Sequence, residues 1–129
     1  MDEFDKWNHV KKRLHSDSVY RGFKEREIFY AHIGENIGFE QNGKGEKFMR
    51  PVLIIKKFNR FVFSGIPLST TSKRGKYYFE FQFTEEKTSV AVVSQMKLFD
   101  TKRLVNKIGM INKEDFIDLK QRIKEVYTL

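Results

Sequence analysis

The chain has 129 residues, of which 40% are hydrophobic and 15% aromatic, so it has room for one hydrophobic core but not for two. It contains no cysteine, which excludes disulfides and thiolate metal sites, and no apolar run approaches the roughly 18 residues that span a bilayer. From the acidic N-terminus and the net charge of +8 we expect a soluble, cytoplasmic protein whose charge either attracts a polyanion or only maintains solubility.

The first predicted element is an amphipathic helix over residues 3–16. Its apolar side chains recur at helical spacing, and basic residues lie on the other side. The apolar positions are Phe4, Trp7, Val10 and Leu14. We therefore expect residues 1–24 to form an N-terminal helix and linker, and residues 25–129 to form the main domain.

A strand, a long loop and a second strand follow. Ile28–Ile33 is apolar and aromatic, which predicts a strand, and a glycine-rich loop extends from Gly34 to Gly45. The β-branched run Val52–Ile55 is typical of a buried strand.

Further short strands are predicted in the middle of the chain. A tight turn leads from the second strand to Phe61–Phe63, and we expect Gly65 and Pro67 to end that pair. The run Tyr77–Phe83 alternates aromatic and polar residues in its second half, and we expect it to pair with a strand over Ser89–Leu98. Short strands with polar turns indicate a small barrel or a strongly curved sheet.

Two helices are predicted at the C-terminal end. Asp100 is placed to cap a short helix that contains Leu104 and Ile108, and Asn112 is placed to cap a longer one. The longer helix has one apolar stripe, which should close the barrel. The stripe consists of Phe116, Leu119, Ile123 and Val126.

Positive charge is concentrated in one stretch. No acidic residue occurs between Pro51 and Phe79, and we expect that stretch to face phosphate groups. Its basic residues are Lys56, Lys57, Arg60, Lys73, Arg74 and Lys76.

Several short motifs follow one another in a particular order. A strand leads into a glycine-rich loop with Glu-Gln, and an Arg-Pro pair starts the next strand. These pieces are Arg26–Tyr30, Gly38–Gln41 and Arg50–Ile55, and the later pieces are Ile66–Thr70, Ser89–Gln95, Asp100, Arg103-Leu104 and Lys107–Gly109. The ordered combination resembles the MazF/PemK toxins over about residues 25–127.

This resemblance implies an α+β, mainly β fold: an SH3-like barrel with an added N-terminal helix and a C-terminal helix, assembled as a homodimer. It also implies the toxin component of a type II toxin–antitoxin system, an endoribonuclease that cuts single-stranded RNA without a metal or other cofactor. The ribose 2′-hydroxyl would attack its own 3′-phosphate and leave a 2′,3′-cyclic phosphate and a 5′-hydroxyl. An acidic antitoxin would lie across the same basic groove.

Four residues are the predicted catalytic group. Arg50 offers a planar, fixed cation for the charge that builds on the phosphate, and Ser69 and Thr70 can donate hydroxyl groups to it. Glu40 is either the base that takes the 2′-hydroxyl proton or a structural acceptor for loop N–H groups, and His32 is an alternative base.

The predicted RNA-binding residues are polar or basic and flank the catalytic group. They are Gln41, Lys44, Lys47, Thr71, Lys73, Arg74, Lys76 and Gln95. Bases can stack on exposed aromatic rings, and we expect one or two of the middle aromatic residues to do so while the others fill the core. The aromatic residues considered are Phe61, Phe63, Tyr77, Tyr78 and Phe81.

The sequence departs from the family pattern at three places. Ser94 stands directly before Gln95, where several relatives carry an acid, residues 42–49 enlarge the first loop, and the N-terminal helix is an addition. These departures keep a second hypothesis open, an RNA- or protein-binding barrel with weakened or lost chemistry. A DNA-binding or gyrase-targeting relative is a third.

Overall fold

Seven strands and one long helix make up the described part of the chain. The computed structural model describes residues 22–33 and 49–128, so the predicted N-terminal helix and glycine-rich loop lie outside the described residues. The strands are β1 (Glu27–His32), β2 (Met49–Lys57), β3 (Val62–Ser69), β4 (Tyr78–Phe81), β5 (Ser89–Val92), β6 (Lys97–Asp100) and β7 (Leu104–Met110). Helix α2 (Lys113–Val126) follows them.

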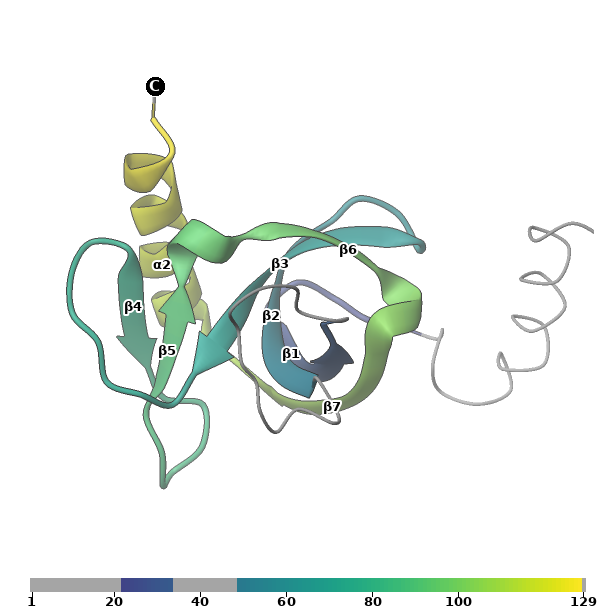
Figure 1. Cartoon of the computed structure of the whole chain (residues 1–129), viewed down its shortest axis with the longest axis horizontal. Helices are drawn as coiled ribbons and strands as arrows, with labels where there is room; N and C mark the ends of the chain where they lie inside the picture. The colour runs from purple at the N-terminus through teal and green to yellow at the C-terminus, as the bar shows by residue number, and fades with distance from the viewer. Residues whose placement is uncertain (1–21, 34–48, 129) are drawn as a thin grey trace, which may run out of the picture.

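The strands form one antiparallel sheet in the order β4-β5-β3-β2-β1-β7, with β6 also paired to β3. Strands β1, β2, β3, β6 and β7 curve around a common centre, whereas β4 and β5 lie beside α2 (Figure 1). The fold is therefore mainly β with a C-terminal helix, as predicted. No helix among the described residues is long and apolar enough to cross a membrane.

Strand β2 shows why its sequence is apolar without alternation. Val52 and Ile54 belong to one buried cluster with Phe63 and Phe99, whereas Leu53 and Ile55 belong to another. Successive side chains of a strand point to opposite faces, so a strand that lies between two cores must be apolar at every position.

Helix α2 is the predicted C-terminal helix. The side chain of Asn112 caps it by accepting a hydrogen bond from the backbone N–H of Asp115 at 2.8 Å. Phe116 and Leu119 are buried in the same cluster as Leu53, so the helix covers that face of the sheet.

The prediction that Gly65 and Pro67 end the second strand pair is wrong. Strand β3 continues through both residues to Ser69. A Cβ atom at Gly65 would lie 2.8 Å from Cγ1 of Val52, so glycine permits close packing there and does not end the strand. Pro67 lies between the part of β3 that pairs with β6 and the part that pairs with β5, where its missing N–H is tolerated.

Two further predictions need correction. Ser89–Leu98 is not one strand, because a 3₁₀ turn at Val93–Gln95 separates β5, which pairs with β4 as predicted, from β6. Asp100 does cap a 3₁₀ turn, yet Leu104 and Ile108 lie in strand β7 and not in a helix. A spacing of four residues places two side chains on one side of a helix and also of a strand, so the pattern was ambiguous.

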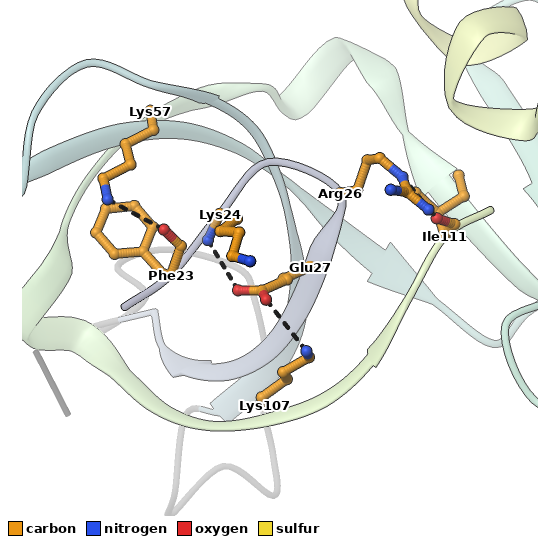
Figure 2. Close-up of polar contacts among 7 residues, drawn as sticks. All are labelled: Phe23, Lys24, Arg26, Glu27, Lys57, Lys107 and Ile111. Carbon is orange, nitrogen blue, oxygen red and sulfur yellow. Dashed lines mark hydrogen bonds and ion pairs between the residues drawn. The ribbon is translucent and has the colours of Figure 1, made fainter. Parts of the chain in front are cut away.

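The start of the described domain is tied to the barrel by a buried carboxylate (Figure 2). Glu27 is 5% exposed and accepts hydrogen bonds from the backbone N–H of Lys24 at 2.8 Å and from Nζ of Lys107 at 3.1 Å. Phe23, 3% exposed, packs against Phe63, and its carbonyl accepts a hydrogen bond from Nζ of Lys57. These contacts hold the segment from Phe23 to Glu27 against the barrel.

Arg26 is held in a left-handed backbone conformation, with φ of +81°. Its backbone N–H donates to the carbonyl of Ile54, and its carbonyl accepts from the N–H of Ile111. Its Nε atom donates to the carbonyl of Ile111 at 3.2 Å (Figure 2). These three bonds join the turn before β1 to β2 and to the segment that enters α2, and they hold a conformation that L residues rarely adopt.

Candidate functional site

A pocket of about 530 Å³ opens where β2 begins and β3 ends. It is lined by residues from β1, β2, β3, β5 and β7, from the turn after β3 and from the loop between β4 and β5. The lining residues are Tyr30, Arg50, Pro51, Leu68, Ser69, Thr70, Thr71, Phe83, Thr84, Lys87, Ser89 and Ile108. Arg50, Ser69, Thr70 and Thr71, all predicted site residues, are therefore brought together in one cavity.

Strand pairing places Arg50 next to the hydroxyl groups. Val52 pairs with Pro67 and Leu53 with Ile66, so the same antiparallel register, continued by two residues, sets Arg50 opposite Ser69. Arg50 is exposed and forms no ion pair with any carboxylate of the described residues. Its guanidinium is thus available to an anion in the pocket.

The hydroxyl cluster is arranged to donate. Oγ of Ser69 accepts a hydrogen bond from the backbone N–H of Thr71 at 3.0 Å, which fixes the turn that follows β3. Because Oγ acts as acceptor in this bond, its own hydrogen remains available for a ligand. Thr70 and Thr71 are exposed and add two further hydroxyl groups beside Arg50.

One wall of the pocket is apolar and depends on a glycine. Phe83 and Ile108 both line the pocket, and Phe83 lies against Gly109 in β7. A Cβ atom at Gly109 would lie 2.7 Å from Cε2 of Phe83 and closer still to Cδ2, so only glycine lets the ring occupy this position. The absence of a side chain in β7 therefore shapes the wall.

Several predicted RNA-binding residues are described but do not line the pocket. Lys73, Arg74 and Lys76 are exposed on the loop after β3, and Gln95 is exposed in the 3₁₀ turn after β5. Lys73 lies over the ring of Tyr78 and Lys76 over that of Tyr77.

Other basic residues of the acid-free stretch lie away from the site. Lys56, Lys57 and Arg60 belong to the opposite end of the β2–β3 hairpin from Arg50. His32 ends β1 beside Met49, and it does not line the pocket.

The aromatic residues considered as base stackers are distributed between core and surface. Phe63 and Phe81 are buried and Tyr78 is half-buried, whereas Phe61 and Tyr77 are exposed. None of these five lines the pocket, where the aromatic residues are Phe83 and Tyr30, which is 38% exposed.

Four predicted site residues lie outside the described residues: Glu40, Gln41, Lys44 and Lys47. Among the described lining residues there is no carboxylate and no imidazole. Nor does any group of three or more His, Cys, Asp or Glu side chains within residues 22–33 and 49–128 gather to hold a metal ion.

The sequence interpretation missed the contribution of the β4–β5 loop and of β7. Phe83, Thr84, Lys87, Ser89 and Ile108 line the pocket without having been considered as site residues. The loop contains more acidic than basic residues, and β7 was expected to be a helix, so local sequence gave no signal for either. Tyr30 lies in a correctly predicted strand, but its exposure on the pocket side depends on the tertiary fold.

A comparison with protein families matches most of the chain to one family. A family model described as "PemK-like, MazF-like toxin of type II toxin-antitoxin system" matches residues 24–127. No curated protein sequence matches the chain.

Among solved structures, the Mycobacterium tuberculosis toxin MazF-mt6 is similar, with 17% identity and a TM-score of 0.63 over 81% of this chain and 98% of that one. MazF from Deinococcus radiodurans has 10% identity and a TM-score of 0.65, over 83% and 97% of the two chains. An endoribonuclease from Mycobacterial species in complex with its cognate antitoxin has 11% identity and a TM-score of 0.64, over 84% and 97%. At these identities the likeness is one of fold.

Proposed function

The chain belongs to the family of PemK-like, MazF-like toxins of type II toxin–antitoxin systems, and we propose that it is an endoribonuclease that cuts single-stranded RNA in the cytoplasm. The cut would leave a 2′,3′-cyclic phosphate and a 5′-hydroxyl without a metal. The observation that carries this proposal is that Arg50 lies beside Ser69, Thr70 and Thr71 in one pocket.

The arrangement suits phosphodiester cleavage. When the 2′-oxygen attacks, negative charge builds on the phosphate oxygens. A guanidinium next to hydroxyl donors therefore stabilises the transition state more than it stabilises the ground state. Arg50 would stabilise the developing negative charge, while Ser69 and Thr70 would hold the phosphate in place. Apolar neighbours such as Leu68 and Ile108 lower the local dielectric and strengthen these interactions.

Glu40 remains our proposed base for the 2′-hydroxyl proton. The described lining residues include no carboxylate and no imidazole, and Glu40 lies on the loop that precedes Arg50 in the sequence. We also propose a homodimer, on the sequence resemblance, with the pocket beside the groove between the two copies.

Replacing the guanidinium tests the proposal directly. We expect Arg50→Ala to lower kcat/KM for RNA cleavage in EDTA by at least about 100-fold, which is typical for the loss of a transition-state donor. The free energy of unfolding should change little, because Arg50 is exposed. Arg60→Ala is the matched control, since Arg60 is an exposed arginine outside the pocket. Cleavage that persists in Arg50→Ala would remove the mechanism.

An acidic antitoxin is the proposed protein partner. The fold neighbours include an endoribonuclease solved with its cognate antitoxin, and the net charge of +8 favours an acidic ligand. We expect an acidic antitoxin peptide to inhibit cleavage competitively with RNA and to bind Arg50→Ala more weakly than the wild type. The same peptide with amides in place of its carboxylates is the control. Inhibition that is independent of RNA concentration would contradict a shared groove.

A binding protein without chemistry is the second candidate function. It is favoured by the described pocket lining, which lacks a base, and by Ser94 at the position before Gln95. Such a protein would bind RNA through Arg50 and yet leave it intact, so a wild-type protein that binds RNA without cutting it would support this second function.

A further inference from the structure

The loop between β4 and β5 carries a lysine where its sequence gives little reason to expect a phosphate contact. Between Phe83 and Ser89 it contains Glu85, Glu86 and a single basic residue, Lys87, so its formal charge is negative. In the fold, Lys87 lines the pocket and neither glutamate does. The loop therefore presents its one cation to the cavity.

Both ends of this loop are fixed in the pocket wall. Phe83 lies against Gly109, where any side chain on β7 would collide with its ring. Ser89, at the other end, starts β5 and is 6% exposed. Lys87 lies between these two anchors, two residues before Ser89.

Strand order places Lys87 and Arg50 on opposite sides of the hydroxyl cluster. Strand β3 lies between β2 and β5, with Arg50 on the β2 side. On the β5 side Ser69 pairs with Val90, directly beyond the loop that holds Lys87. The two flanking backbones are two interstrand spacings apart, on the order of 9 to 10 Å. If the reacting phosphate lies close to Arg50 on the β2 side, the next phosphate of a strand that crosses the hydroxyl cluster comes toward Lys87 on the β5 side.

We propose that Lys87 is a positioning residue that binds the RNA phosphate next to the one held by Arg50 and the Ser69–Thr71 hydroxyls. This inference rests on the proposed function and specifies how the same pocket would hold its substrate. Lys87 forms no ion pair with a carboxylate in the described part of the chain, so its ammonium group is available for this contact. Lys87 would strengthen substrate binding, and it would not stabilise the charge that develops on the reacting phosphate.

The test is a salt titration of RNA affinity. A fluorescein-labelled pool of single strands with 2′-fluoro sugars and randomised sequence lacks the nucleophile and cannot be cut by this route. We expect Lys87→Gln to lower the slope of log K against log salt by about 0.7, the value for one phosphate contact on a single strand. In cleavage assays it should raise KM several-fold with kcat within about twofold, and Lys87→Arg should restore both values.

Glu86→Gln is the matched control, because it changes the charge of the same loop by one without touching the pocket. It should leave the salt slope unchanged. Suppose that Lys87→Gln and Glu86→Gln shift RNA affinity by equal and opposite amounts and that neither changes the salt slope. The change in affinity then comes from the long-range electrostatic field of the loop, and the proposed contact does not exist. If the wild type binds RNA but Lys87→Gln has no effect, the inference fails alone. A wild type that binds no RNA removes the proposed function as well.

Discussion

Some site residues of this protein could be predicted from the sequence and others could not, and one of them also has a structural role. Ser69 fixes a turn through Thr71 and still offers a hydroxyl hydrogen to the pocket. Arg50 was predictable because a guanidinium between a flexible loop and a buried strand fits phosphate chemistry and matches the family motif. Lys87 could not be predicted as a site residue, because Glu85 and Glu86 make the loop negative overall. Only the fold shows that Lys87 lines the pocket.

Glu27 provides a prediction about stability. Glu27→Gln keeps an acceptor for the Lys24 N–H and loses only the ion pair with Lys107, whose side chain is 48% exposed, so we expect a loss of about 0.5–1 kcal/mol. Glu27→Ala also leaves the N–H without its partner, which should add about 1–2 kcal/mol. Urea unfolding of both variants measures the difference. Equal free energies of unfolding for the two variants would show that the bond to Lys24 contributes nothing.

At the scale of elements, segments whose local pattern has one main interpretation were predictable, and segments defined by their pairing partners were not. Strand β1, the core of β2 and helix α2 were predicted correctly, since a β-branched run and a capped apolar stripe each have one main interpretation. Strand β7 was taken for a helix because its apolar spacing fits both structures. The break between β5 and β6 arises from the change of pairing partner along β3, which no local pattern encodes.

The contact between Phe83 and Gly109 predicts that substitutions at these two residues have non-additive effects on stability. Gly109→Ala forces Phe83 from its place, and we expect it to cost about 1–3 kcal/mol of folding free energy and to raise KM for RNA by disturbing the pocket wall. Once Phe83 is replaced by alanine, the same change at Gly109 should cost much less. A double-mutant cycle from urea unfolding gives the interaction energy. Additive effects of the two substitutions would contradict the contact.

At the scale of the whole molecule, the contacts of Phe23 bear on where the folding unit begins. The boundary was expected between residues 24 and 25, yet Phe23 packs against Phe63 and its carbonyl binds Lys57. We therefore propose that the domain starts at residue 22 or 23.

Two truncations test this boundary. A chain of residues 22–129 should keep the free energy of unfolding of the same domain in the full chain to within about 0.5 kcal/mol. A chain of residues 24–129 should lose about 3 kcal/mol or more, because it lacks a phenylalanine that is 3% exposed in the core. Thermal and urea unfolding provide the comparison. Equal stability of the two truncations would place the boundary after Phe23.

The central claim is that the Arg50 pocket promotes attack by the ribose 2′-hydroxyl on the adjacent phosphate. The most direct measurement is end analysis of an RNA cut in EDTA, compared with the same RNA carrying one 2′-deoxy sugar immediately 5′ of the cut. We predict cyclic phosphate and 5′-hydroxyl ends from the first RNA and no cut at that position in the second. Cleavage of the deoxy-substituted site, or 5′-phosphate ends, would contradict the account.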